Sequence, residues 1–368
     1  MSEPVHYRML INGEWVDASD GARFDSINPA TEQAWCSIPE ATADDINRAV
    51  ETAHDAFSSG EWASLTPTAR GKYLRRLAEL LDEQSEHLGR IETIDTGKML
   101  KETRWQAKYI AEFFQFYAGC ADKISGQTLP IDKPDMTITL REPLGVVAAV
   151  VPWNSQLFLV AVKIGPALAA GNVVVLKASE HASAAMLEFG KLVEAAGFPP
   201  GVINIVTGHA DPCGKVLTSH PLVQRISFTG GTGAAKHVVR NSAENFAQVS
   251  LELGGKSPFI VFGDANIESA VNGSIAGIFG ASGQSCVAGS RLYLHNSIAD
   301  EFLERMLAVT ATIRIGDPLA EETQMGPLAT LAQIEHIERQ VALAQEQGGT
   351  VLSGGQRPQT PNQGWFYE

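Results

Sequence analysis

The sequence predicts an α/β fold built on a parallel sheet that helices cover on both faces. The first observation is a series of short, continuously apolar runs, the pattern of strands buried on both faces. The second is that helical stretches, such as 181–196 and 211–219, separate most of these runs. The runs are 146–151, 173–176, 202–206, 226–228 and 258–262. Ligands bind beyond the carboxyl ends of such strands, so the residues that follow each run are candidates for chemistry.

The flanking segments have patterns of their own. Residues 1–40 are rich in strand and turn signals. Thr42 and Asp45 form a capping-box pair that predicts the start of a helix. The sequence ends on three aromatic residues before Glu368, more apolar surface than a solvated terminus usually carries. We further expect helices over 67–90 and 98–122, a half-exposed strand over 135–142 and a loop over 354–364.

Composition limits the classes of partner. The 368 residues are 44% hydrophobic, enough for a sizeable core, and carry a formal net charge of −14, which argues against nucleic acid or an anionic membrane as the partner. No segment approaches the roughly 18 consecutive apolar residues of a membrane span. The first six residues lack the pattern of a secretory leader. The four cysteines form no C-x-x-C pair, so we expect reduced thiols in a cytoplasmic protein and no metal site.

Polar and glycine-rich segments follow several of the apolar runs. Taken singly, each has a plainer explanation, because a lone cysteine is usually a small buried hydrophobe and a glycine-rich turn before a helix is often only a turn. The segments are Val151-Pro152-Trp153-Asn154, Lys177-Ala178-Ser179-Glu180, Phe228-Thr229-Gly230-Gly231, Leu251-Glu252-Leu253-Gly254-Gly255-Lys256 and Gly283-Gln284-Ser285-Cys286.

Taken together, these segments resemble the aldehyde dehydrogenase superfamily of NAD(P)-dependent enzymes. The likeness runs from about residue 8 to the last residue, and its motifs are PWN, LKASE, GFPPGVINIVTG, FTG, LELGGKSP, GQSCVAGSRLYLH and MGPLAT. It implies a Rossmann-like dinucleotide-binding domain over 1–123 and 144–253, a bridging and oligomerisation strand segment over 124–143, and a second α/β domain, the catalytic one, over 254–368. It also implies a homo-oligomer, either a dimer or a tetramer.

The resemblance assigns the catalytic roles to three residues. Cys286 is the expected nucleophile, which attacks the aldehyde carbon to give a thiohemiacetal. A free thiol has a pKa of about 8.5, so the thiolate needs a nearby cation or backbone N–H groups. The side-chain amide of Asn154 and the backbone N–H of Cys286 are the expected oxyanion donors. Glu252, expected to be partly buried, would activate the water that hydrolyses the resulting thioester.

The same resemblance predicts where the cofactor binds. The pyrophosphate is expected at the helix that begins after Gly230 and Gly231, where backbone N–H groups point outward. Lys177 and Glu180 match contacts to the adenosine ribose, and a carboxylate there would repel a 2′-phosphate, which favours NAD while leaving NADP open. The family often has a glycine at the position of Ala235. The other expected cofactor residues are Val151, Pro152, Trp153, Gly208, Phe228, Thr229, Leu253 and Gln333.

One departure from the family's pattern concerns the end of the chain. The family's chain continues beyond this point and supplies a second glutamate and a phenylalanine, in an E-I-F-G-P-type segment, that position the nicotinamide ribose. We therefore expect a C-terminally truncated chain or a fragment. It would lack one clamp on the cofactor and would expose a sheet edge.

The substrate is expected to be a small-molecule aldehyde whose identity the sequence leaves open. Some relatives that oxidise cationic aldehydes have a tryptophan where this chain has Val162, which weakens the case for an ammonium substrate and gives a slight preference to an apolar or aromatic aldehyde. Two other functions stay open: acyl transfer to coenzyme A, against which Glu252 argues, and a non-catalytic binding protein or inactive truncated product. The residues expected to border the aldehyde tunnel are Phe116, Tyr117, Ser155, Gln156, Phe158, Val162, Ser285 and Val287.

Overall fold

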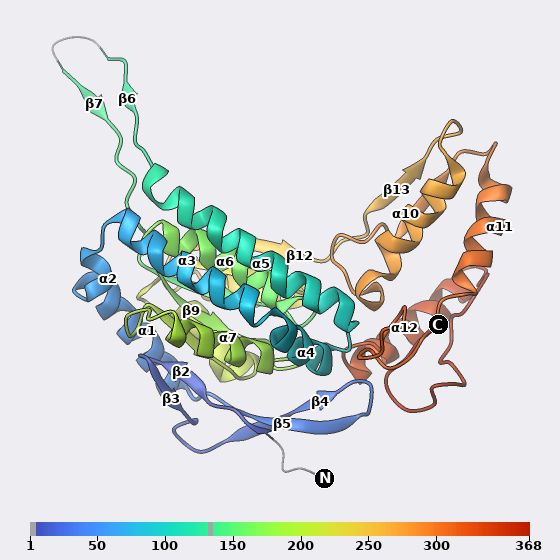
Figure 1. Cartoon of the computed structure of the whole chain (residues 1–368), viewed down its shortest axis with the longest axis horizontal. Helices are drawn as coiled ribbons and strands as arrows, with labels where there is room; N and C mark the ends of the chain where they lie inside the picture. The colour runs from blue at the N-terminus through green and yellow to red at the C-terminus, as the bar shows by residue number, and fades with distance from the viewer. Residues whose placement is uncertain (1–4, 132–134) are drawn as a thin grey trace.

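A seven-stranded sheet forms the centre of the larger part of the molecule (Figure 1). The computed structural model describes residues 5–131 and 135–368. Four of the six N-terminal residues on which the prediction about a secretory leader rests lie outside the described residues. Five strands run parallel, β2 pairs antiparallel with β10, and β3 pairs antiparallel with β2. In spatial order the strands are β12 (Gln248–Leu253), β11 (Val223–Gly230), β8 (Val146–Val150), β9 (Val173–Lys177), β10 (Ile203–Val206), β2 (Met9–Ile11) and β3 (Glu14–Val16).

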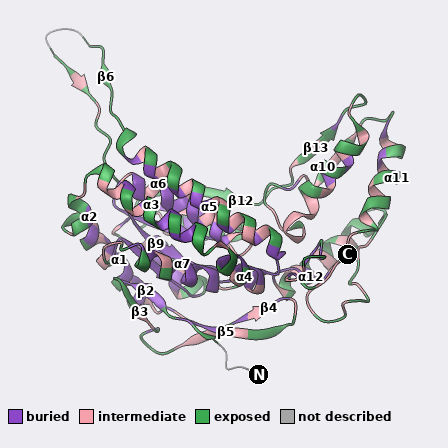
Figure 2. Ribbon diagram, viewed as in Figure 1, coloured by how far each residue is buried: buried purple, intermediate pink, exposed green. Residues whose placement is uncertain are grey.

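Helices cover both faces of this sheet, as the sequence predicts. On one face α6 (Gln156–Ala169) and α7 (Ala184–Ala195) contact the central strands, and α3 (Pro67–Glu83), α4 (Ser85–Thr96) and α5 (Leu100–Cys120) pack outside them. On the other face lie α1 (Ala43–Ser58), α8 (Lys215–Ser219) and α9 (Thr232–Asn241). Every residue of β8, β9 and β10 is buried, and Figure 2 shows the buried colour concentrated in this layered body. The predicted α/β class with a covered parallel sheet is confirmed.

The order of the strands defines where a ligand can bind. From β8 the chain steps outward to β9 and β10, then returns to the other side of β8 to form β11 and β12. The direction of winding therefore reverses between β8 and β11. A crevice opens at such a switch point, beyond the carboxyl ends of the two strands. The residues at this place are Val151–Asn154 after β8 and Phe228–Gly230 at the end of β11.

Several predicted elements differ in extent from those observed. The Thr42 capping box is present, with the Asp45 backbone N–H donating to Thr42 Oγ1 at 3.2 Å. The helix expected over 67–90 is two helices that meet at Gln84. The stretch 211–219 begins with a short turn, η2 (Ala210–Gly214), because Asp211 has an extended backbone.

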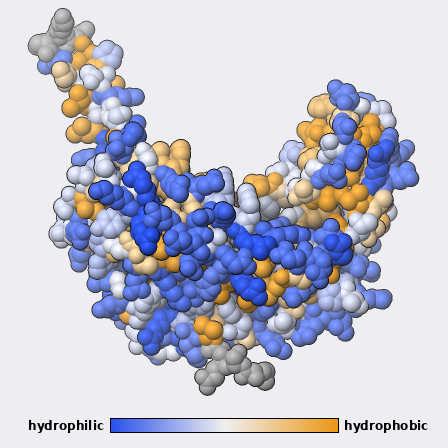
Figure 3. Space-filling view, viewed as in Figure 1, coloured by the Kyte–Doolittle hydropathy of each residue, from blue (hydrophilic) through white to orange (hydrophobic). Residues whose placement is uncertain are grey.

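A narrow two-stranded arm projects from one end of the body (Figure 1). It contains β6 (Thr128–Leu129) paired antiparallel with β7 (Thr137–Ile138), so the strand expected over 135–142 is only two residues long. An isolated hairpin has no core of its own. Several of its apolar side chains are exposed, and Figure 3 shows orange patches along the arm between white and blue ones; the exposed apolar residues include Leu129, Ile131, Met136, Ile138 and Leu140.

The C-terminal part has a small core of its own. The parallel strands β13 (Pro258–Val261) and β14 (Arg291–Leu294) pack with α10 (Ile267–Phe279) and α11 (Ala299–Thr310) around a separate cluster of four buried side chains. The domain division predicted at residue 254 stays a prediction. The remaining elements are β1 (Val5–His6), β4 (Arg23–Asn28), β5 (Gln33–Pro39), α2 (Glu61–Ser64), η1 (Ala121–Lys123), η3 (Gly280–Gly283) and α12 (Leu331–Glu346).

The aromatic end of the chain packs against the body. Phe366 is buried, the Trp365 N–H donates to Pro29 O at 2.8 Å, and Trp365 O accepts from the Leu328 N–H at 2.8 Å. The apolar character of these last residues therefore reflects packing and not solvent exposure. Among the described residues, no helix combines the length and the apolar character that crossing a membrane requires.

Candidate active site

The segment that carries Cys286 has an unusual backbone. After α10 ends at Phe279, Ala281 and Ser282 adopt positive φ angles of 52° and 53°, and Gly283 follows at 75°. Side chains with a Cβ rarely occupy this left-handed region, and each such residue costs on the order of 1–3 kcal/mol. Cys286 follows three residues later and is exposed. A strained turn therefore presents the thiol at the surface.

Three hydrogen bonds from other parts of the chain hold this turn. Glu102 Oε1 accepts from the Ala281 N–H at 3.2 Å, and Ser282 Oγ donates to Gly326 O at 2.9 Å. The Ala329 N–H donates to Gln284 Oε1 at 3.0 Å. The MGPLAT motif thus contacts the segment that leads to Cys286 through two hydrogen bonds, a role that the sequence did not assign to it. Glu102 carried no sequence signal, because it lies on α5, far away in the chain.

Asn154 is hydrogen-bonded directly to the segment that leads to Cys286. Its Nδ2 donates to Gln284 O at 2.7 Å, two residues before Cys286. A primary amide has two N–H donors, so the second remains for an oxyanion. The segment after β12 also approaches, since a methyl group added at Gly255 would lie 3.1 Å from the Cys286 carbonyl oxygen. The structure therefore brings Asn154 and Cys286 together with the strand end that follows Glu252.

Glu252 lies on β12, directly opposite Thr229 of β11. It is exposed rather than partly buried as expected, because β12 is an edge strand of the sheet. Its charge acts on Lys163 of α6: burial lowers the pKa of Lys163 to about 8, and the Glu252 carboxylate acts against that shift. The Lys163 Nζ also donates to Ser227 Oγ at 3.1 Å. Sequence reasoning missed Lys163, which appears as one more polar residue within an apolar helix.

The expected adenosine end of the cofactor site lies at the end of β9. Lys177 is the last residue of this strand and its Nζ lies 3.2 Å from Glu180 Oε2. Burial alone would raise the pKa of Glu180, but Lys177 holds it below its usual range. Val151 is next to Lys177, since its N–H donates to Lys177 O at 3.2 Å. At Gly208 a methyl group would lie 2.9 Å from Cys213 Cβ, so only glycine fits there.

The expected phosphate site lies at the end of β11. Gly231 is the N-cap of α9 and provides no side-chain hydrogen bond, so the first N–H groups of the helix stay free for an anion. The first turn of α9 has no acidic residue. A methyl group on Gly230 would lie 2.6 Å from Phe228 Cζ, so a side chain does not fit at this position. The glycine therefore leaves its own backbone uncovered. Thr229 Oγ1 is buried without a hydrogen-bond partner among the described residues.

The remaining predicted cofactor residues differ in their surroundings. Pro152 and Trp153 are half-buried at the switch point, and Leu253 is half-buried on β12. Gln333 lies in the first turn of α12, where Thr330 Oγ1 caps its backbone N–H at 3.2 Å. Within the described part of the chain, no hydrogen bond connects Gln333 with the other predicted cofactor residues.

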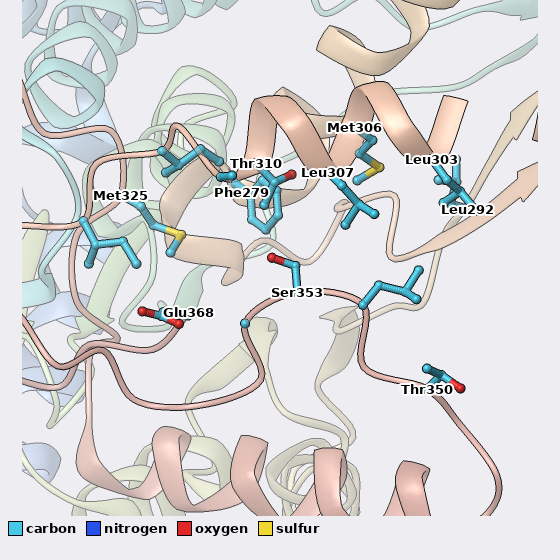
Figure 4. Close-up of a pocket in the computed structure, with 15 residues that line it drawn as sticks. Phe279, Leu292, Leu303, Met306, Leu307, Thr310, Met325, Thr350, Ser353 and Glu368 are labelled. Carbon is cyan, nitrogen blue, oxygen red and sulfur yellow. The ribbon is translucent and has the colours of Figure 1, made fainter. Parts of the chain in front are cut away.

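Two hollows differ in their relation to this site. The larger, about 610 Å³, lies beneath α11 and is lined by apolar side chains such as Phe279, Leu307 and Met325 (Figure 4). No predicted site residue lines it. The second, about 550 Å³, is lined by Ser285 and Val287, which flank Cys286. Its full lining is Lys98, Lys101, Glu102, Trp105, Gln106, Ser155, Ala276, Gly277, Gly280, Ala281, Ser285 and Val287.

The predicted tunnel residues are therefore only partly together. Ser155 joins Ser285 and Val287 in the lining of the hollow beside Cys286. Val162 instead lines a separate hollow of about 400 Å³ that also contains Lys163. The aromatic residues pack among themselves, with Phe158 against Phe113 and Tyr109, and Phe116 against Tyr117. Gln156 is fully buried.

Comparison with known proteins gives one consistent result. The chain matches the model of the "Aldehyde dehydrogenase family" over residues 15–368. It is 56% identical to the (Z)-2-((N-methylformamido)methylene)-5-hydroxybutyrolactone dehydrogenase of Acinetobacter baylyi, over 95% of this chain and 72% of that protein. It is 42% identical to the hydroxyisobutyraldehyde dehydrogenase of Mycolicibacterium austroafricanum, over 98% and 71%.

Solved structures agree with the sequence relatives. The NAD⁺ complex of an aldehyde dehydrogenase from Bacillus cereus superposes with a TM-score of 0.96 at 38% identity, covering 99% of this chain and 74% of that one. An aldehyde dehydrogenase structure from Burkholderia cenocepacia also gives 0.96, at 42% identity, with 98% and 74% covered. The chain therefore belongs to the aldehyde dehydrogenase family.

Proposed function

We propose that this chain oxidises an aldehyde to a carboxylic acid with NAD as hydride acceptor, through a thioester on Cys286. The observation that carries the proposal is the 2.7 Å hydrogen bond from Asn154 Nδ2 to Gln284 O. It ties an amide donor to the segment of an exposed thiol, at the switch point of a dinucleotide-type sheet. Nucleophile and oxyanion donor are thus neighbours through a contact that spans 130 residues of sequence.

Each catalytic residue has one step in the proposed reaction. Cys286 Sγ attacks the carbonyl carbon, and the oxyanion accepts hydrogen bonds from the second Asn154 N–H and the Cys286 backbone N–H. When bound, the nicotinamide accepts the hydride that leaves this carbon. Glu252 then removes a proton from water, which attacks the thioester and releases the acid and the free thiol. The Glu252 carboxylate in turn acts on Lys163, whose lowered pKa it partly restores.

The choice of NAD rests on the residues at the ends of β9 and β11. The uncapped amides of α9 and the bare backbone at Gly230 suit a pyrophosphate. Glu180, held ionised by Lys177, suits a ribose with a free 2′-hydroxyl and disfavours a 2′-phosphate. The similar Bacillus cereus structure is an NAD⁺ complex, which supports the same choice.

The setting of the enzyme is also a proposal. Two relatives act, by their names, on a hydroxybutyrolactone and a hydroxyisobutyraldehyde, so we infer a small oxygen-bearing substrate. The arm supports a homo-oligomer, because its exposed apolar side chains are of the kind that pack against another subunit. All four cysteines are free, which suits a reducing compartment such as the cytoplasm.

A direct test mixes the chain with propanal and NAD and follows the absorbance of the reduced cofactor. Cys286→Ala should abolish the signal, whereas Cys120→Ala, which changes another accessible thiol, should retain it. Turnover by Cys286→Ala at the wild-type rate would refute the proposed nucleophile. If product forms only when coenzyme A is added, acyl transfer replaces hydrolysis as the second half of the reaction.

A further inference from the structure

A buried lysine lies in the wall of the hollow beside Cys286. Lys98 is only 2% exposed and comes two residues before α5. Its Nζ donates to Gln106 Oε1 at 2.6 Å and to Ser155 Oγ at 3.1 Å. All three residues line the 550 Å³ hollow, so the ammonium joins two other side chains of the same wall. Both of these acceptors are neutral. Burial raises the pKa of the Glu92 carboxyl and the Lys98 charge lies near enough to act against that larger effect, but among the described residues Glu92 makes no hydrogen bond with Lys98. A buried cation gains from a further hydrogen-bond acceptor.

The group formed by Lys98, Gln106 and Ser155 offers donors rather than acceptors. An ammonium has three N–H donors, and the two hydrogen bonds use two of them. Ser155 Oγ and Gln106 Oε1 both accept from Lys98, which leaves the serine O–H and the glutamine NH₂ to donate. Within the described residues, neither of these donors has a hydrogen-bond partner. One Lys98 N–H, the Ser155 O–H and the Gln106 NH₂ group are therefore left as donors in the lining of one hollow, and an acceptor oxygen satisfies them best.

The rest of the hollow is consistent with a small polar substrate. Trp105 stacks on Tyr109 with ring centroids 5.0 Å apart and provides one apolar wall. Lys101 and Glu102 are the other charged residues of the lining. The Lys101 Nζ donates to Thr323 O, and Glu102 Oε1 accepts from Ala281 N–H, so both are engaged in holding neighbouring backbone. Of the three charged residues in this lining, Lys98 is the one whose side-chain hydrogen bonds go to other side chains of the hollow.

We propose that Lys98, Gln106 and Ser155 form a polar subsite that selects aldehydes carrying a second, hydrogen-bond-accepting oxygen, either a carboxylate or a neutral carbonyl. The proposal rests on the oxidation at Cys286 proposed above and names the substrate class for it. It replaces the preference for an apolar or aromatic aldehyde that the sequence gave, because that preference considered neither Lys98 nor Gln106.

The test compares substrates matched in chain length. We would measure kcat/KM for 4-oxobutanoate against pentanal and for methyl 4-oxobutanoate against hexanal. One charge-assisted hydrogen bond corresponds to roughly a 10- to 100-fold preference. A preference in the first pair assigns a carboxylate, and a preference in both pairs assigns any carbonyl oxygen. Equal values within both pairs would overturn the subsite.

Variants show whether the three side chains cause the preference. Lys98→Met should reduce the oxygenated-to-alkyl ratio by about 10-fold or more, mainly through KM. Gln106→Leu, at a half-buried position, should reduce it several-fold even if Lys98→Met folds poorly. Lys108→Met is the matched control, since it removes an exposed lysine from the same helix as Gln106 and should leave the ratio unchanged. If Lys98→Met and Gln106→Leu lower both members of each pair equally, the residues are structural and the proposal fails.

A second measurement needs no turnover. Succinate or its dimethyl ester should slow the alkylation of Cys286 by iodoacetamide, followed by peptide mass spectrometry, and Lys98→Met should abolish this protection. Protection that depends on Lys98 in a chain that oxidises no aldehyde would support the subsite while refuting the proposed oxidation. Oxidation of all four aldehydes without any such protection or preference would leave the oxidation standing and refute the subsite.

Discussion

The two halves of the proposed active site, the cofactor half and the nucleophile half, are built in different ways. The proposed cofactor half consists of strand ends in one buried sheet, where Lys177 pairs with Val150, Gly230 pairs with Leu253, and the Val151 N–H donates to Lys177 O. The nucleophile half is a turn with two left-handed non-glycine residues, and contacts from α5 and from residues 326–329 hold it in place. The first half follows from local patterns, whereas the second depends on residues distant in the sequence.

This difference determines how each half should respond to change. The strand ends are held by a buried sheet, so a substitution there should weaken cofactor binding mainly when the new side chain does not fit. A strained turn has an alternative relaxed conformation, so losing one restraint lets it move. Catalysis depends on both, because hydride transfer requires the thiol and the cofactor cleft to face each other at the right distance.

The largest effect on turnover should come from replacing Glu252, the proposed general base. Glu252→Gln leaves the size of the side chain unchanged but removes the base. We expect steady turnover to fall by about 10³-fold, within the range for general bases. A single burst of reduced NAD equal to the enzyme concentration should remain, because acylation does not use this base. Rapid-mixing absorbance would measure it. Loss of the burst together with turnover would place Glu252 in the first step instead.

The next effect should come from crowding the rigid half. A methyl group on Gly230 would lie 2.6 Å from the Phe228 ring, and overpacking of this kind costs about 1–3 kcal/mol. We expect Gly230→Ala to raise the KM for NAD by about 10-fold, in line with that cost. The matched control is Gly119→Ala on α5, outside the proposed cofactor site, where a methyl group meets no atom within 4 Å. If both variants bind NAD equally well, this strand end does not contact the cofactor.

The predictability of the two halves differs for the same physical reason. Alternation of buried strands and helices predicted the sheet, and the strand-end motifs placed Val151, Lys177 and Gly230 at one edge. The sequence could not show that Glu102, Gly326 and Ala329 hold the turn, because no periodicity connects residues so far apart. It also misjudged the exposure of Glu252, which depends on β12 being the edge strand. MGPLAT was recognised as a motif, but its contact with Ser282 and Gln284 emerges only in three dimensions.

A smaller effect should come from loosening the strained half. Ser282→Ala removes the hydrogen bond to Gly326 O but keeps a Cβ at φ 53°. Losing one such bond costs about 0.5–1.5 kcal/mol, so kcat should fall roughly 3- to 10-fold with the KM for NAD unchanged. Ser282→Gly loses the same bond but relieves the strain and should be the more stable of the two in thermal unfolding. Equal stability of the two variants would argue against strain at this position.

The smallest expected effect is on the pH dependence of stability and concerns Lys163, on which the Glu252 carboxylate acts. Burial lowers its pKa to about 8 from an ordinary value of 10.5. Between these two pH values the unfolded chain therefore binds more protons than the folded one. By linkage, the unfavourable contribution of Lys163 to the free energy of unfolding fades as pH rises from 8 to 10.5. Lys163→Met removes the contribution, so its gain in the free energy of unfolding should be greater at pH 7 than at pH 9.5, by on the order of 1 kcal/mol. Denaturant titrations of both proteins at the two pH values measure the difference. A gain that does not change with pH would mean that the Lys163 ammonium is as well solvated in the folded protein as in the unfolded chain, and that it stays protonated beside Glu252 throughout this range.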